Sequence, residues 1–226
     1  MQRLEAVLFD CDGTLLDSAP DIGQALNLML EECDRPPLPL EQIKGFLGDG
    51  MMELCCRALT ATGGLPQDDV YPFVQKFITH YRKVPADPSQ IYAGGREALE
   101  ALSGAGVKLA MCTNKQEAAT RRIFDQLDLT RYFAAIAGGD TYMVHKPHPD
   151  HVLNLLKAMD VSPEGTLFVG DGMNDVLASR QAGVKCVIIT HGYSDDWEAL
   201  GADALIGGFG ELTAAIEKLG FSIVGK

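Results

Sequence analysis

The 226-residue sequence lacks any apolar run close to the roughly 20 residues that a helix needs to span a bilayer. Its amino terminus also lacks the basic start and the small-residue cleavage site of a secretory signal peptide. We therefore expect a cytoplasmic protein that has no membrane partner.

Basic residues are scarce as well, because 19 Lys and Arg stand against 31 Asp and Glu, which gives a net charge of −12. Nucleic acids and anionic membranes are bound through clusters of basic side chains. The composition argues against both as partners. An anionic substrate would need cationic groups that are gathered locally.

Cysteine pairs at the spacing of a zinc or redox site are missing from the sequence. The six cysteines form no C-x-x-C pattern, and Cys112 and Cys186 lie inside apolar runs. We expect all six to be reduced residues that serve packing.

Short apolar runs that end in polar or glycine residues are present, and they are typical of buried strands. They cover residues 4–10, 107–113, 134–137, 166–170, 184–190 and 202–207. Helical patterns alternate with them at 95–103, 115–127, 149–159, 174–182 and 210–219. The alternation predicts an α/β fold, a Rossmann-like parallel sheet with helices on both faces.

Residues 18–83 interrupt this alternation with helical patterns at 18–33, 41–47, 51–61 and 67–83. We interpret residues 17–88 as a small α-helical cap domain that is inserted into a core made of residues 1–16 and 89–226. The proline-rich segment 84–90 suits a hinge, so we expect the cap to move.

Polar side chains follow four of the predicted strands, and ligands of open parallel sheets bind beyond the carboxyl ends of the strands. In the order of the strands, these side chains are Asp10 and Asp12, Thr113 and Asn114, Lys146, and Asp171 and Asp175.

Two or three carboxylates around an open position are what Mg²⁺ prefers, and Asp10, Asp12 and Asp171 are the candidates. Thr113 and the N–H groups that open the following helix offer neutral donors to a phosphoryl group, and Lys146 adds a fixed cation. One carboxylate could then attack phosphorus to form an aspartyl phosphate. A second could protonate the leaving alcohol and later deprotonate water.

The segments "DCDGT" with "LLDS", "CTN", "KP" and "GDGMND" resemble the four signature motifs of the haloacid dehalogenase superfamily, specifically its phosphatases. This resemblance implies Mg²⁺ as cofactor, Asp10 as nucleophile and Asp12 as general acid and base. It also implies that Thr113, with Asn114, and Lys146 bind phosphate. The metal site would comprise Asp10, Asp12, Asp171 and Asp175, the last either contacting the ion or orienting Lys146.

The cap segment "GFLGDGMMELCCRAL" resembles the corresponding segment of bacterial phosphoglycolate phosphatases. This makes 2-phosphoglycolate the leading substrate among small phosphorylated metabolites. The fourth motif departs from the serine-containing version common in those enzymes, because Gly172 stands at that position. Arg57 in the cap either grips a substrate carboxylate or is a solvated helix residue. Asp17 and Ser18 are expected to cap the first cap helix.

Other functions stay open at this stage. The same machinery could act on pyrophosphate or a sugar phosphate, or could work as a sugar-phosphate mutase. Outside enzymes, a phospho-acceptor receiver domain or a module that only binds a phosphorylated ligand would share some of these residues. The protein could be a monomer or a homodimer.

Overall fold

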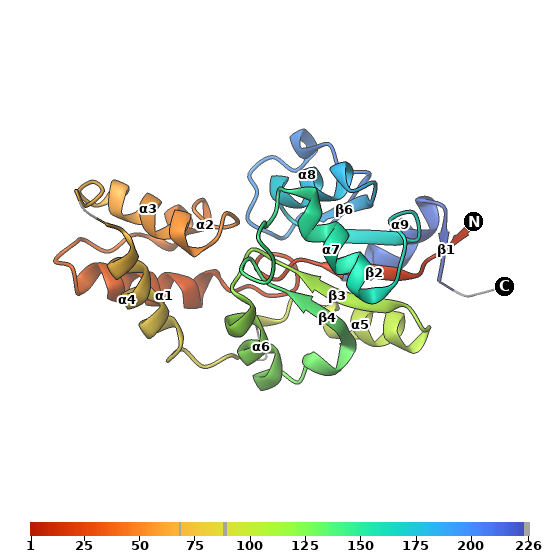
Figure 1. The fold of residues 1–226 in the computed structure, drawn as a ribbon, viewed down its shortest axis with the longest axis horizontal. Coiled ribbons are helices and arrows are strands. Elements are labelled where there is room, and N and C mark those ends of the chain that lie inside the picture. The colour runs from red at the N-terminus through yellow and green to blue at the C-terminus, as the bar shows by residue number, and fades with distance from the viewer. Residues whose placement is uncertain (68, 88–89, 224–226) are drawn as a thin grey trace.

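The computed structural model describes residues 1–67, 69–87 and 90–223. The chain forms two lobes, an α/β core that carries both termini and a helical cap on the side away from them (Figure 1). Among the described helices, none is long and apolar enough to cross a membrane.

The core is built on a parallel sheet of six strands in the order β4-β3-β2-β5-β6-β7. The strands are β2 (Ala6–Phe9), β3 (Lys108–Cys112), β4 (Phe133–Ala137), β5 (Thr166–Gly170), β6 (Lys185–Ile189) and β7 (Ala204–Ile206). All six predicted strands are confirmed, with ends that differ by at most two residues. Phe9 of β2 pairs with Met111 on one side and Val169 on the other, so the carboxyl ends of these strands are level.

Helices cover both faces of the sheet, as predicted (Figure 1). Alternate residues of β2 pack on opposite faces, Val7 and Phe9 in one core cluster and Ala6 and Leu8 in the other. Five core helices confirm the five helical patterns: α5 (Gly95–Gly104), α6 (Glu117–Gln126), α7 (Pro149–Met159), α8 (Met173–Gln181) and α9 (Leu212–Lys218). The first cluster includes residues of α5, α6 and α9, and the second includes residues of α7 and α8.

Some short elements escaped prediction. β1 (Gln2–Arg3) and β8 (Phe221–Ser222) form a separate parallel pair that joins the two ends of the chain. Short 3-10 helices lie at Thr130–Tyr132, Glu198–Leu200 and Phe209–Glu211. Two or three residues are too few for a periodic pattern to show in the sequence.

The cap consists of α1 (Ala19–Glu31), α2 (Leu40–Lys44), α3 (Met51–Ala61) and α4 (Tyr71–Tyr81), which confirms that the inserted region is helical. Its core lies between α1 and α4, where Leu26 and Met29 are fully buried and Phe77 stacks on Tyr81. The division at residues 16/17 and 88/89 stays a prediction, and its second boundary lies outside the described residues.

The two connections between cap and core run side by side. The Asp17 N–H donates to the Gln90 carbonyl at 2.8 Å, and the Tyr92 N–H donates to the Leu15 carbonyl at 3.1 Å. Leu16 and Ile91 form an isolated antiparallel bridge between the same two segments. The chain therefore leaves the core and returns to it at one place.

Candidate active site

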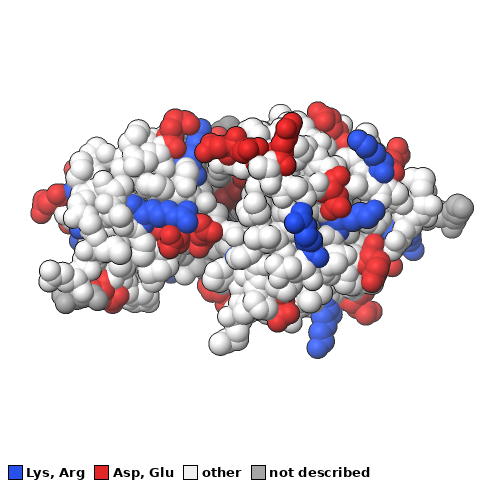
Figure 2. Space-filling model, turned by 90° about the horizontal axis from the view of Figure 1, so that it is seen from above, with Lys and Arg blue, Asp and Glu red and all other residues white. Residues whose placement is uncertain are grey.

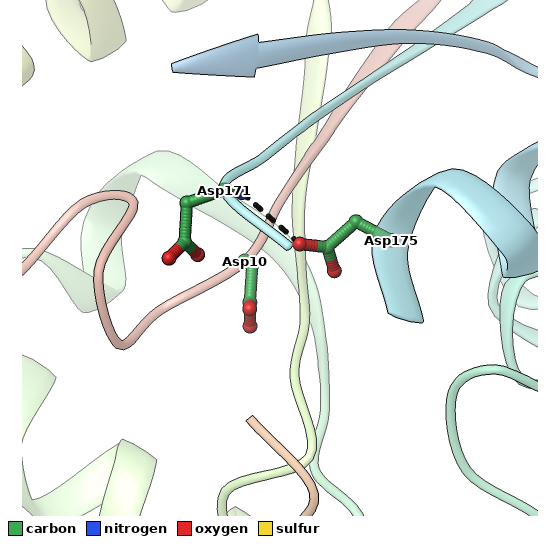
Figure 3. Close-up of side chains that lie close together, drawn as sticks. All are labelled: Asp10, Asp171 and Asp175. Atoms are coloured by element: carbon green, nitrogen blue, oxygen red, sulfur yellow. Dashed lines mark hydrogen bonds between the residues drawn. The ribbon is translucent and has the colours of Figure 1, made fainter. Parts of the chain in front are cut away.

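Three carboxylates converge at the carboxyl end of the sheet (Figure 3). Asp10 follows β2, Asp171 follows β5, and Asp175 lies in the first turn of α8. Each offers one oxygen, and these oxygens all lie within 4.8 Å of one another. Neighbouring parallel strands bring the first two acids together, and the turn from β5 into α8 adds the third.

The electrostatics of this cluster fit a divalent cation. Burial raises the pKa of Asp10 to about 6, although Lys146 opposes the shift. Burial, and then the charges of Asp175 and Asp10, raise the pKa of Asp171 well above its usual range. A hard cation with oxygen ligands would relieve this repulsion, so the donor set suits Mg²⁺.

Lys146 is almost completely buried among these acids. Its Nζ lies 3.0 Å from Asp10 Oδ1 and 2.6 Å from Asp175 Oδ1. The other oxygen of Asp175 accepts hydrogen bonds at 3.1 Å from the N–H groups of Asp171 and Gly172. Both oxygens of Asp175 are thus engaged in holding Lys146 and the start of α8, which favours the orienting role among the two expected for it.

Asp171 is fixed by groups that the sequence analysis missed. The Thr14 hydroxyl donates to its Oδ1 and the Tyr193 N–H to its Oδ2, both at 2.9 Å. The backbone of Gly13 and of Gly192 lies close against the same carboxylate. A Cβ added at either position would lie 2.4 Å from Asp171 Oδ2, which is too close. Tyr193 lies 22 residues further along the chain, so no local pattern pointed to it.

Asp12 lies apart from the three-acid cluster. Its Oδ1 and Oδ2 accept hydrogen bonds from Lys115 Nζ at 2.8 and 3.1 Å, and Oδ1 also accepts one from the Ser18 hydroxyl at 2.5 Å. The cap expectation for Ser18 was wrong, because it stands at the N-cap position of α1 but its side chain makes no capping bond. Asp17 instead accepts a hydrogen bond from the Tyr193 hydroxyl.

Lys115 is a further residue that the sequence analysis missed. Its side chain is 5% exposed, and its Nζ lies 4.7 Å from the centre of the Tyr81 ring in the cap. Burial works against its charge, but Asp12 more than compensates and the pKa of Lys115 is raised. A lysine directly after the strand-end pair Thr113–Asn114 was the available signal.

Thr113 and Asn114 follow β3 as expected, but their surroundings differ. Thr113 is buried, and its hydroxyl accepts the Lys115 N–H at 3.2 Å. The Asn114 amide donates to two backbone carbonyls, those of Gly48 at 2.9 Å and Lys146 at 2.8 Å. In this conformation the donor side of Asn114 therefore links the cap to the loop that carries Lys146.

A cavity of about 270 Å³ lies between the cap and the core, and Asp10, Asp12 and Thr113 line its core side. Six apolar side chains of the described part of the cap line the cavity, followed by Tyr81 and Arg82 at the end of α4: Ile22, Leu47, Met51, Leu54, Phe77 and Ile78. Lys115, Arg82 and Arg122 add three cations to the lining. The space-filling view shows the face hollowed where the two lobes meet, with basic and acidic side chains scattered over both lobes (Figure 2).

Arg57 is not among the described residues that line this cavity. Its guanidinium is bound by Asp49 at 2.5 Å and Glu53 at 3.0 Å. A contact between Arg57 and substrate thus stays a prediction that the present conformation does not display.

Taken together, the arrangement offers a partly buried carboxylate, Asp10, that lines the cavity and lies beside Asp171, Asp175 and Lys146, in a cluster of acids that could hold a cation. A second carboxylate, Asp12, lies two residues further along the same loop. This set can form and break a covalent bond to an electrophile that carries negative charge.

Comparison with known proteins agrees with this geometry. The family model of haloacid dehalogenase-like hydrolases matches residues 7–189. A phosphoglycolate phosphatase of Agrobacterium fabrum is 39% identical over 215 residues, which cover 94% of this chain and 92% of that protein. One of Chromobacterium violaceum is 38% identical over 94% of this chain and 96% of its own length.

Among solved structures, a protein from Haemophilus somnus 129pt, named a predicted phosphoglycolate phosphatase, superposes with a TM-score of 0.89. It is 28% identical, and the match covers 95% of this chain and 98% of the other. Since the family model spans most of the sequence and contains every motif described above, the chain belongs to the haloacid dehalogenase-like hydrolases.

Proposed function

We propose that this protein is a Mg²⁺-dependent phosphatase of small phosphate monoesters, with 2-phosphoglycolate as its main substrate. The observation that carries the proposal is the position of Asp10, which lines the cavity and also belongs to the acid cluster and the ion pair with Lys146. The names of the two similar curated proteins support the choice of substrate.

The chemistry follows from the chain's own residues. A carboxylate oxygen of Asp10 attacks phosphorus while the bond from phosphorus to the ester oxygen breaks, and Asp12 gives a proton to the departing alkoxide. A water molecule then attacks the aspartyl phosphate, Asp12 takes its proton, and inorganic phosphate leaves. Lys146 and the Thr113 hydroxyl hold phosphoryl oxygens in place. Asp10 and Asp171 would hold Mg²⁺ beside Asp175, and the ion would supply additional positive charge.

The cavity favours a small leaving group with an anionic end. Its volume is about 270 Å³, and the apolar cap side chains Ile22, Leu47, Met51, Leu54, Phe77 and Ile78 offer no hydrogen-bond partners for the hydroxyl groups of a sugar. Lys115, Arg82 and Arg122 supply positive charge for a carboxylate. These features favour 2-phosphoglycolate over a sugar phosphate and over the mutase alternative.

The test is phosphate release from a substrate panel, with Mg²⁺ and then with EDTA. The panel contains 2-phosphoglycolate, ethyl phosphate, glucose 6-phosphate, β-glucose 1-phosphate and pyrophosphate. We expect kcat/KM for 2-phosphoglycolate to exceed the others by at least about tenfold, since one paired charge contributes that much. Asp12→Asn should lower kcat about 10²- to 10⁴-fold.

Acid-quenched turnover of ³²P-labelled substrate should yield an acyl phosphate in the wild type and none in Asp10→Asn. Full activity of Asp10→Asn would refute the mechanism. Equal rates across the panel would refute the substrate assignment while leaving the phosphatase activity in place.

A further inference from the structure

The loop that joins α2 to α3 in the cap bonds to two asparagines of the core. Asn174 Nδ2 donates to Asp49 Oδ1 at 2.7 Å and to the Gly48 carbonyl at 3.2 Å. Asn114 Nδ2 donates to the same Gly48 carbonyl at 2.9 Å. Two consecutive cap residues are therefore held by two core side chains, one from the loop after β3 and one from the first turn of α8.

Both asparagines stand next to residues of the active site. Asn174 is the second residue of α8 and directly precedes Asp175. Asn114 follows Thr113 and also donates to the Lys146 carbonyl. The cap loop is thus bonded to the segments that position Asp175 and Lys146.

Within the cap, Arg57 orients Asp49. The Arg57 NH2 group binds Asp49 Oδ2 at 2.5 Å, which leaves Oδ1 for Asn174. Arg57 also binds Glu53 at 3.0 Å and donates to the Phe46 carbonyl at 3.3 Å, so its guanidinium is fixed on three sides. Asp49 therefore offers only Oδ1 to the core, because Arg57 binds Oδ2.

The connections between the lobes are fastened differently. The Tyr193 hydroxyl accepts the N–H groups of Ser18 and Ala19, and Arg122 donates to the carbonyls of Tyr81 and Val84. These bonds hold the chain where it enters and leaves the cap. A rotation of the cap about its connections can preserve them, whereas it separates Gly48 and Asp49 from the core.

We propose that Gly48 and Asp49 with Asn114 and Asn174 form a latch that holds the cap closed over bound substrate, and that Arg57 is a positioning residue that presents Asp49 to Asn174. Gly48 and Gly50 line the cavity, so closing the latch completes the cavity wall. This inference concerns closure and does not depend on which monoester is hydrolysed. It gives Arg57 a role that needs no contact with substrate.

A double-mutant cycle tests the latch. We measure kcat/KM for Asp49→Ala, Asn174→Ala and the double variant with 2-phosphoglycolate and with p-nitrophenyl phosphate. Each single change should lower kcat/KM about tenfold for both substrates, as expected for a lost hydrogen bond to a charged group. The double variant should be no worse than either single one. Multiplying effects, with a coupling below about twofold, would overturn the proposal.

Arg57→Met separates the two roles of that residue. If Arg57 acts through the latch, the change costs activity in the wild type but has no further effect in Asn174→Ala, with either substrate. If Arg57 grips a carboxylate, its loss persists in Asn174→Ala and affects 2-phosphoglycolate alone, which would overturn the positioning role. Lys44→Met is the matched control, because it breaks the Lys44–Glu41 ion pair inside the cap. Its kcat/KM should stay within about twofold, as surface pairs contribute little.

Hydrogen exchange gives a readout that requires no turnover. Mg²⁺ with orthovanadate should slow amide exchange of residues 45–50 in the wild type and in Lys44→Met. The protection should be lost in Asn174→Ala, while the midpoint of urea unfolding stays unchanged. Equal protection in Asn174→Ala would overturn the latch even if the preferred substrate proves to be another monoester.

Discussion

At the scale of single residues, the carboxylate of Asp171 is held by contact with glycine backbone as much as by hydrogen bonds. An added Cβ at Gly192 would lie 2.2 Å from Asp171 Cβ, a separation that no pair of carbon atoms tolerates without displacement. The adjacent Tyr193 N–H bond to Asp171 Oδ2 depends on the same approach. Gly192 therefore sets the direction in which the Asp171 carboxylate, one acid of the proposed metal site, points.

We predict that Gly192→Ala weakens Mg²⁺ binding about 10- to 100-fold, the usual loss when the support of a metal ligand is disturbed. The Mg²⁺ concentration for half-maximal phosphatase activity measures this. Gly210→Ala is the matched control, since an added Cβ there would meet nothing within 4 Å. An unaltered Mg²⁺ requirement in Gly192→Ala would contradict the prediction.

The sequence identified residues of this site whose chemistry is local to a strand end. Asp10 and Asp171 were found because carboxylates at the ends of parallel strands lie at the same edge of the sheet, and Asp175 because its motif resembles that of the family; the structure brings these three together and leaves Asp12 apart from them. It could not identify Tyr193 or Thr14, because their contacts with Asp171 arise from tertiary folding of ordinary loop residues. For the same reason the pairing of Arg57 with Asp49 was beyond a sequence pattern.

At the scale of elements, helix α1 begins without a cap from its own chain segment. The Tyr193 hydroxyl, from the loop after β6, accepts the N–H groups of Ser18 and Ala19 at 2.9 Å each and donates to Asp17 at 3.1 Å. The free N–H groups at a helix start need such acceptors. A core loop thus supplies the cap for the first helix of the inserted domain.

We predict that Tyr193→Phe lowers the free energy of unfolding by about 1–2 kcal/mol, because buried N–H groups lose their acceptor. Urea denaturation measures the loss, and Tyr71→Phe at a half-exposed position of α4 is the control. The Mg²⁺ requirement should be retained, since the backbone bond to Asp171 does not involve the hydroxyl. Equal stability of both variants would rule out this capping role.

Elements with a clear sequence pattern were all predictable, namely the six strands of the main sheet, the core helices and the helical insertion. The central strands appear as short continuous apolar runs because both of their faces are buried, whereas the apolar residues of the helices recur every three to four positions. The β1–β8 pair shows no such repeat because it depends on the ends of the chain meeting.

At the scale of the whole molecule, a chain with net charge −12 buries several acids at one place. The pKa of Asp10 is about 6 in the native protein, against 3.8 for the ordinary group. Between these two pH values Asp10 is protonated in the metal-free native state and ionised in the unfolded state. The free energy of unfolding then falls as pH rises from about 4 to about 6. A bound cation removes this cost because it stabilises the ionised carboxylates.

We therefore predict that Mg²⁺ raises Tm more at pH 7.5 than at pH 5. Metal at a hundred times its dissociation constant contributes about 2.7 kcal/mol, which for a protein of this size is a shift of about 5–10 °C. Differential scanning fluorimetry with Mg²⁺ against EDTA checks this, with Asp171→Asn as the variant that should show no shift. A shift that is the same at both pH values would contradict the assignment of the cation site.

The two segments that connect the cap to the core lie side by side, which separates the insertion from the sheet. Residues 15–17 and 90–92 are hydrogen-bonded to each other. The geometry of the sheet is therefore independent of the length of the segment inserted between them. Evolution can exchange or enlarge the whole insertion, and with it the choice of substrate, while the reacting groups stay where the strands put them. A chimaera in which another family member's insertion replaces this one between the same two segments should fold and should show the substrate preference of the protein that donated the insertion.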